Sequence, residues 1–192
     1  KTVSFEKNNA RISFVVKNDE ECVDFLQTAI QTLQANQNEW SHPKGIYYRP
    51  NGMDTDGKIV ALFSGQGSQY VGMGKALFEE HQIVRELFEQ ASDTLHLDMQ
   101  NLCFEASADE LNSTENTQPA LLLCSVAAWQ VFQQQTGLTP SYMAGHSLGE
   151  LSALVAAGAM SVDTGLKLAR SRGLAMSHCG NDGLTGMSAV TK

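Results

Sequence analysis

Residues 141–158, SYMAGHSLGELSALVAAG, decide how this chain folds. Residues 142–144 read as a short strand, and 147–157 is a run of small and apolar residues that is typical of a tightly packed helix. Between the two lies Gly145-His146-Ser147-Leu148-Gly149, which fits the pattern G-x-S-x-G. That pattern describes a sharp turn from a strand into a helix, with small residues two positions either side of the serine. Because a strand and a helix are both predicted here, the stretch indicates an α/β fold.

Ser147 is the candidate nucleophile of this turn. A helix N-terminus aims free N–H groups at a developing oxyanion, and the N–H of Leu148 is the natural donor. The alternative is a serine that only caps a tight turn. His146 is adjacent, but consecutive side chains diverge at such a turn, so we assign it to the turn and the substrate site and not to a general base. None of the other histidines marks a convincing base: His42, His81, His96 and His178.

A second glycine-rich stretch, Gly65-Gln66-Gly67-Ser68-Gln69, follows the apolar run 59–63, which is expected to be a strand buried on both faces. Tyr70 stands where a dinucleotide fingerprint needs glycine, so a nicotinamide cofactor is not expected. A glycine-rich loop at the carboxyl end of a strand is where ligands bind in open α/β sheets, and Gln66 could donate a hydrogen bond there. The alternative is a tight turn without function.

Two arginines, Arg170 and Arg172, flank the apolar stripe of a helix that Ser161 caps. At about 100° per residue they lie on opposite sides of the stripe, so periodicity does not choose between them. Either could pair with a carboxylate, and either could simply be solvated.

The chain divides into two predicted units at residue 57. In residues 1–57 we expect a strand at 12–16, a helix at 19–35 capped by Asn18, and a strand at 45–49. The stripe of that helix comprises Cys22, Leu26, Ala29, Ile30 and Leu33. In 58–192, strands alternate with helices, which predicts a mainly parallel sheet. The expected segments there are strands at 59–63, 142–144 and 184–190, and helices at 69–79, 82–96, 147–157 and 161–178, with one more that has Pro119 near its start and runs to 135.

Composition excludes several classes of protein. The 192 residues hold 13 Lys and Arg against 21 Asp and Glu, a net charge of -8, which argues against a nucleic-acid partner. No stretch approaches the ~20 apolar residues of a membrane span, and no signal peptide is visible, so we expect a cytoplasmic protein. The four cysteines have no metal-site spacing and are expected to be reduced thiols; no metal or bound cofactor is implied.

Taken together, four motifs resemble the malonyl-CoA:acyl-carrier-protein acyltransferases. They are FSGQGSQYVGMG at 63–74, NTQPALLL at 116–123, GHSLGE at 145–150 and RSRGLAM at 170–176, in the order that this family shows. Residues 1–57 resemble the linker between ketosynthase and acyltransferase in multidomain polyketide and polyunsaturated fatty acid synthases. The resemblance implies an α/β-hydrolase-like parallel-sheet core at 58–192, with most of a smaller ferredoxin-like subdomain missing, preceded by a small α/β linker unit.

The resemblance also implies roles for matching positions. Ser147 would take a malonyl group from coenzyme A, the N–H groups of Gln66 and Leu148 would form the oxyanion hole, and Gln118 would line the site. Arg172 would pair with the free carboxylate of malonate. The acyl group would then pass to the phosphopantetheine thiol of an acyl carrier protein, with a ketosynthase domain as neighbour and the coenzyme A thioester as substrate.

The family's catalytic histidine lies in a motif that this sequence does not contain, so we expect little turnover from the chain alone. Ser64 replaces a frequent proline of the family, with little expected effect. A serine hydrolase or thioesterase of the α/β-hydrolase type is the alternative enzyme, and water in place of a carrier thiol as acceptor would distinguish it. A third hypothesis makes residues 1–57 a non-catalytic module that positions neighbouring domains.

Overall fold

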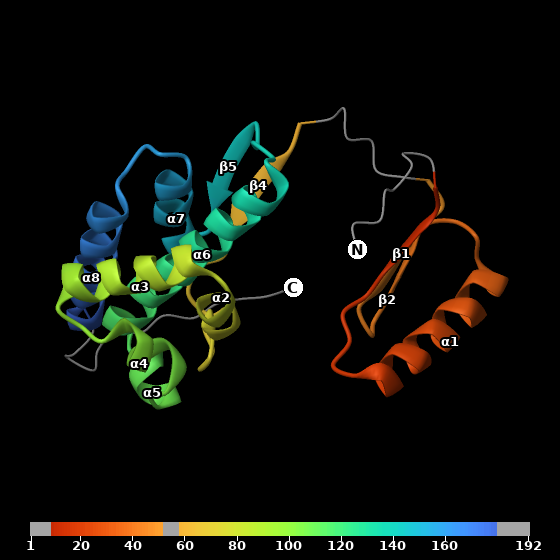
Figure 1. The fold of residues 1–192 in the computed structure, drawn as a ribbon, viewed down its shortest axis with the longest axis horizontal. Helices are drawn as coiled ribbons and strands as arrows, with labels where there is room; N and C mark the ends of the chain where they lie inside the picture. Colours follow the sequence, from red (N-terminus) through yellow and green to blue (C-terminus); the bar gives the residue numbers. More distant parts are fainter. Residues whose placement is uncertain (1–8, 52–57, 180–192) are drawn as a thin grey trace. The chain divides into compact units, whose positions relative to one another are not determined.

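The computed structural model describes residues 9–51 and 58–179, which belong to two compact units, 1–57 and 58–192 (Figure 1). The predicted strand at 184–190 lies outside the described residues. Within those residues, no helix has both the length and the apolar character that crossing a membrane requires.

The first unit packs one helix against a three-stranded antiparallel sheet. Its elements are β1 (Arg11–Ser13), α1 (Asp19–Ala35), β2 (Trp40–His42) and β3 (Ile46–Arg49), and the strand order is β1-β3-β2. Phe25 and Ala29 of α1 and Ile46 of β3 form its buried centre. The bounds of α1 are those expected from the sequence, whereas β2 has no counterpart among the predicted elements.

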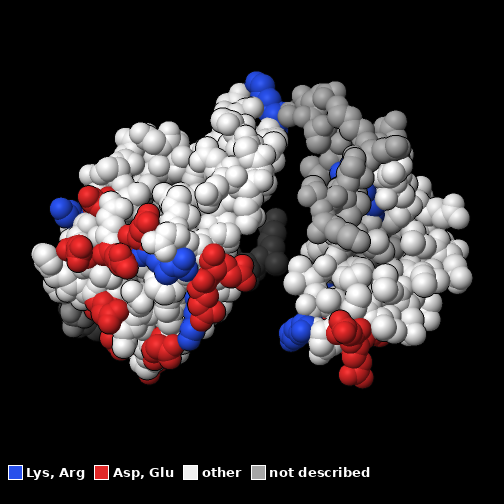
Figure 2. All heavy atoms as spheres, viewed as in Figure 1, with Lys and Arg blue, Asp and Glu red and all other residues white. Residues whose placement is uncertain are grey.

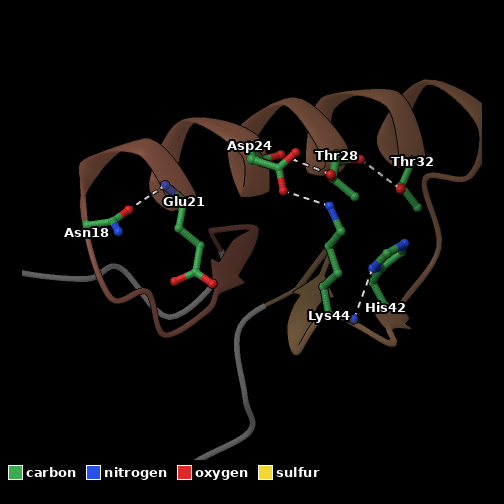
Figure 3. A network of polar contacts seen from close by, with 7 residues as sticks. All are labelled: Asn18, Glu21, Asp24, Thr28, Thr32, His42 and Lys44. Carbon is green, nitrogen blue, oxygen red and sulfur yellow. Dashed lines mark hydrogen bonds and ion pairs between the residues drawn. The ribbon is translucent and has the colours of Figure 1, made fainter.

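Local hydrogen bonds explain where α1 begins and how it holds the hairpin (Figure 3). Asn18 Oδ1 accepts the N–H of Glu21 at 2.8 Å, the N-cap that the sequence predicts. Lys44, in the turn between β2 and β3, donates from Nζ to Asp24 Oδ2 of α1 at 2.7 Å. Helix and hairpin are therefore tied by a surface ion pair as well as by apolar packing.

The expected apolar stripe of α1 is only partly buried. Ala29 is 2% exposed, but Leu26 and Ile30 are 43% and 55% exposed, and Phe25 takes the central buried place instead. The apolar side of the helix is wider than three strands of three or four residues can cover, so its outer part faces solvent.

In the second unit, helices pack against one face of a two-stranded parallel sheet. The strands are β4 (Val60–Phe63) and β5 (Tyr142–Gly145), and Phe63 lies opposite Gly145. The helices are α2 (Lys75–Glu80), α3 (Gln82–Leu95), α4 (Met99–Phe104), α5 (Ala108–Asn112), α6 (Thr114–Thr136), α7 (Leu148–Ala156) and α8 (Val162–His178). Figure 1 shows α6 as the central helix, and α3, α7 and α8 all pack against it.

Three predictions about this unit are wrong. The helix expected at 69–79 begins only at Lys75, because the residues before it form turns that contain Gly72 and Gly74, both with positive φ. The strand after Lys58 is not buried on both faces: Val60 and Leu62 of β4 are 48% and 79% exposed, because the described helices cover one face of the sheet. The helix that contains Pro119 starts at Thr114, so Pro119 lies in its second turn and not in its first.

The buried centre of the second unit is an unbroken apolar cluster. Phe88, Met99, Leu122 and Leu166, from α3, α4, α6 and α8, are each 0% exposed within it. Leu148 belongs to the same cluster, so the first residue of α7 is anchored in the core. This anchoring fixes the position of the residue just before it, Ser147.

Candidate active site

Ser147 occupies a strained turn between β5 and α7. Its backbone has φ 53° and ψ −106°, a combination that a residue other than glycine rarely adopts. The side chain is exposed, whereas Leu148 directly after it is buried. The turn therefore presents Oγ to solvent at the carboxyl end of the sheet, which is the geometry that the G-x-S-x-G pattern predicts.

Close backbone contacts explain the two glycines of the motif. A Cβ on Gly145 would overlap the carbonyl carbon and oxygen of Gly149, and a Cβ on Gly149 would overlap the carbonyl oxygen of Phe63. Both contacts are with main chain, which cannot rotate away. The strand β4, the strand β5 and the start of α7 approach so closely here that only glycine fits at either position.

Gln66 and Leu148 occupy equivalent places on the two strands. Phe63 and Gly145 are paired ends of β4 and β5, and Gln66 and Leu148 each follow three residues later. Among residues 9–51 and 58–179, neither backbone N–H has a hydrogen-bond partner. The structure thus leaves two free donors after neighbouring strands, as an oxyanion site requires. The side chain of Gln66 points elsewhere and donates from Nε2 to Thr114 Oγ1 at 3.4 Å.

His146 belongs to the turn itself. Its N–H donates to Phe63 O at 3.1 Å and its carbonyl accepts the N–H of Gly149 at 2.9 Å. A Cβ on Gly65 would overlap the carbonyl oxygen of His146 and would lie 2.9 Å from its Nδ1. The residue therefore holds the glycine-rich loop against the turn, and no histidine of the described segments hydrogen-bonds Ser147 Oγ.

Arg172 of α8 reaches the serine. Its Nη2 donates to Ser147 Oγ at 2.9 Å and its Nη1 donates to Gln118 Oε1 at 2.7 Å. Gln118 is 0% exposed on α6, and its Nε2 contacts Met176 Sδ at 3.3 Å, so the amide is oriented from both ends. Sequence periodicity left Arg170 and Arg172 equivalent, and the structure separates them: Arg170 turns to Glu115 O and Asn116 Oδ1.

Arg172 carries a half-buried positive charge that has no counter-charge among the described residues. Both of its partners are neutral oxygens, and within the described segments it makes no ion pair. Figure 2 shows acidic side chains spread over the visible face of the second unit, with few basic ones among them. A half-buried guanidinium gains most from an anion with two oxygens, so this place is suited to a carboxylate.

Among residues 9–51 and 58–179, no group of three or more His, Cys, Asp and Glu side chains is arranged to hold a metal ion. The chemistry available at the site is an exposed hydroxyl, two free N–H donors and one guanidinium.

Known proteins match the part of the chain that contains this site. The model of the family described as Acyl transferase domain matches residues 60–192. A malonyl CoA-acyl carrier protein transacylase of Bacillus subtilis is 47% identical over 134 residues, which are 70% of this chain and 34% of the relative. Polyketide biosynthesis protein PksE of Bacillus subtilis (strain 168) is 41% identical over 134 residues, 70% of this chain and 17% of that protein.

Solved structures show the same likeness. An acyl-carrier-protein S-malonyltransferase from Burkholderia pseudomallei superposes with a TM-score of 0.60 at 48% identity, over 62% of this chain and 39% of that one. The chain thus spans between about a third and two fifths of the length of these transacylases.

Proposed function

The chain belongs to the acyl transferase domain family, and from that membership we propose that residues 60–192 carry the nucleophile side of a malonyl transferase site. The donor would be malonyl-CoA and the acceptor the phosphopantetheine thiol of an acyl carrier protein. The transacylase and the S-malonyltransferase, whose names state this reaction, are 47% and 48% identical to the chain, which supports the proposal without extending it to their full length.

The reaction would proceed in two half-reactions. Ser147 Oγ attacks the thioester carbonyl of malonyl-CoA, the C–S bond breaks, and coenzyme A leaves as its thiol with the proton that the serine gives up. The carrier thiol then attacks the serine ester, and Ser147 recovers a proton as the malonyl group leaves. The N–H groups of Gln66 and Leu148 would stabilise the oxyanion in both steps.

The charge of Arg172, which forms no ion pair with any residue that the structure describes, is the observation that carries the malonyl assignment. A malonyl group has a free carboxylate beyond its thioester and an acetyl group has none. With acetyl bound, the half-buried guanidinium would still lack a counter-charge, which is unfavourable. Gln118 would hold the guanidinium in place while Nη2 exchanges the serine hydroxyl for the substrate carboxylate.

The general base would be contributed from outside the described residues. The hydrogen-bond partner of Ser147 Oγ in the described segments is the guanidinium of Arg172, which cannot accept a proton. We therefore propose that acylation by the described residues alone is slow.

A chimera tests the function most directly. Residues 60–192 would replace the matching segment of the Bacillus subtilis transacylase, which supplies the rest of the fold. We expect a malonyl-sized mass gain on the chimera with malonyl-CoA, transfer to an acyl carrier protein, and loss of both in Ser147→Ala. Release of free malonate, with none on the carrier, would instead support a hydrolase.

Residues 1–57 would act as a positioning unit beside a ketosynthase domain, as their resemblance to a linker implies. Their own small apolar centre of Phe25, Ala29 and Ile46 supports a separately folded unit. Deleting them should leave acylation of Ser147 unchanged, measured by intact mass. Loss of acylation in a folded deletion variant would contradict this assignment.

A further inference from the structure

Pro119, in the second turn of α6, leaves one main-chain carbonyl of the helix without its usual hydrogen-bond donor. Proline has no N–H, so the carbonyl of Glu115, four residues earlier, cannot receive its normal helical hydrogen bond. Pro119 is buried and Glu115 is half-buried, so water does not readily replace that donor. A carbonyl left without a partner in such a place is destabilising.

Arg170 of α8 supplies the missing donor. Its Nη1 lies 2.8 Å from Glu115 O and 2.5 Å from Asn116 Oδ1. Both acceptors are neutral, and within the described segments Arg170 makes no ion pair. Its guanidinium therefore binds one main-chain carbonyl and one side-chain amide oxygen of α6, and no carboxylate of the described segments.

Gly173 brings the two helices into backbone contact at the same place. A Cβ on Gly173 would lie 2.7 Å from Glu115 Cα and 2.7 Å from Thr114 O. Gly173 itself is buried. Two neighbouring residues of α8 therefore contact the first turn of α6: Arg170 by hydrogen bonds and Gly173 by close backbone packing.

The orientation of Arg172 depends on these contacts between α8 and α6. Arg172 lies about 200° around the helix from Arg170, on the other flank of the face that meets α6. A rotation of α8 by roughly 20° would move a side-chain tip at ~6 Å from the axis by about 2 Å. That displacement is enough to break the 2.9 Å bond from Arg172 to Ser147 Oγ.

We propose that Arg170 is a positioning residue, which fixes the rotation and register of α8 on α6 so that Arg172 faces Ser147. The importance of this position rests on the proposed function, because Arg172 is there the partner of the malonyl carboxylate. Arg170 itself touches neither the serine nor the place of the substrate.

The test observes Arg172 directly in the 192-residue chain. The chain has five arginines, Arg11, Arg49, Arg85, Arg170 and Arg172, so the NMR spectrum of ¹⁵N-arginine-labelled protein is simple. The Arg172 guanidinium is assigned by its loss in Arg172→Lys. With both Nη groups bonded to fixed partners, we expect separate, slowly exchanging Nη signals. In Arg170→Met these signals should merge or vanish.

Arg85 provides a matched control. Its Nη1 also donates to main-chain carbonyls, those of Phe78 and Glu79, both at 2.9 Å and all in α2 and α3. Arg85→Met removes a guanidinium from the backbone of a helix end without touching α8. The Arg172 signals should therefore remain as in the parent chain.

Adding Pro119→Ala distinguishes two effects of Arg170: positioning α8, and donating a hydrogen bond to Glu115 O. In Pro119→Ala/Arg170→Met the alanine brings a backbone N–H to position 119 that can bond Glu115 O, so the thermal stability lost in Arg170→Met should return. The Arg172 signals should stay lost, because no hydrogen bond then joins α8 to Glu115 and Asn116 and only the close approach of Gly173 remains. Their return with stability, or their persistence in Arg170→Met, would overturn the proposal.

A folding failure of Arg170→Met would not leave the matter open. The double variant then carries the test, and Arg170→Lys, which keeps a cationic donor, should retain the Arg172 signals. These signals do not depend on acyl transfer. If the chimera transfers no malonyl group while Arg170→Met disrupts Arg172, the proposed function fails and the positioning role stands.

Discussion

Gly149→Ala should separate α7 from the sheet. The new Cβ would overlap Phe63 O and would lie 2.8 Å from both the Phe63 carbonyl carbon and Ser64 O, all main-chain atoms of β4 and its following loop. These atoms would have to retreat by about 1 Å to reach an ordinary contact distance. A strand cannot retreat alone, because β4 is paired with β5 along its length. The strain therefore has to be relieved by moving α7 outward.

The expected destabilisation lies at the upper end of what overpacking produces. Insertion of one methyl group into a packed core typically costs about 1–3 kcal/mol, and a clash with backbone leaves the fewest ways to relax, so we expect about 3 kcal/mol. Outward movement of α7 also loosens the contacts of Leu148, which is 0% exposed. For a chain of this size the melting temperature should fall by roughly 6–12 °C.

Urea unfolding followed by tryptophan fluorescence measures this loss. Trp129 of α6 is 7% exposed and its ring contacts Phe63, so it reports on the second unit. The other tryptophan, Trp40, lies in the first unit and is replaced by Phe in every protein compared. A loss of about 3 kcal/mol lowers the urea midpoint by about 1–3 M, for slopes of about 1–3 kcal/mol per M.

Gly158→Ala is the matched control for backbone conformation. Gly158 has φ +73° and no atom within 4 Å of an added Cβ. The free energy of unfolding lost in Gly158→Ala therefore reflects only the left-handed backbone, about 1–2 kcal/mol. Gly149 does not have a positive φ, so the stability lost in Gly149→Ala would come only from the overlap of the new Cβ with the main chain of Phe63 and Ser64. If Gly149→Ala is no more destabilising than Gly158→Ala, the close-approach argument for the motif is refuted.

Three further predictions concern charge, capping and protonation. In the chimera, Arg172→Gln should reduce the preference for malonyl-CoA over acetyl-CoA by about tenfold or more, because one hydrogen bond to a charged group is lost. Intact mass after competition between the two thioesters measures this preference. An unchanged preference would count against the carboxylate assignment. Ser161→Ala removes the bond from Thr164 N–H to Ser161 Oγ at the start of α8 and should cost about 1 kcal/mol in thermal unfolding, with Ser161→Asp restoring it; equal stability of Ser161→Ala and the parent chain would contradict the cap. A hydrogen bond with Cys103 and burial raise the pKa of Cys124 well above 9.0, so the folded chain holds this proton more tightly than the unfolded chain. The free energy of unfolding should therefore fall as pH rises above about 9, and Cys124→Ala should flatten that fall in urea titrations from about pH 8 to 10; the same slope in both would refute it.

Local signals explain which elements could be predicted from the sequence. The start of α1 at Asp19 and of α8 at Val162 follow from Asn18 and Ser161, whose side chains accept N–H groups three residues on. The three residues of β2 carry no such signal, because their pairing with β3 depends on residues across a turn. The sequence misplaces the start of α6, because proline is typical of a first helical turn. A donor more than fifty residues away, Arg170, is what accommodates Pro119 further inside the helix.

The sequence alone determined the turn around Ser147, because its requirement is short-range. A nucleophile between a strand and a helix, with glycine two residues either side, is a pattern of five consecutive residues. Which arginine of α8 faces the serine was decided only by tertiary structure. Arg170 and Arg172 are equivalent by periodicity, and their difference comes from α6: the proline that leaves Glu115 O without a donor, and the buried amide of Gln118. Helical periodicity fixes the angle between two side chains on one helix. Only packing against a second helix fixes how that pair is rotated toward the site.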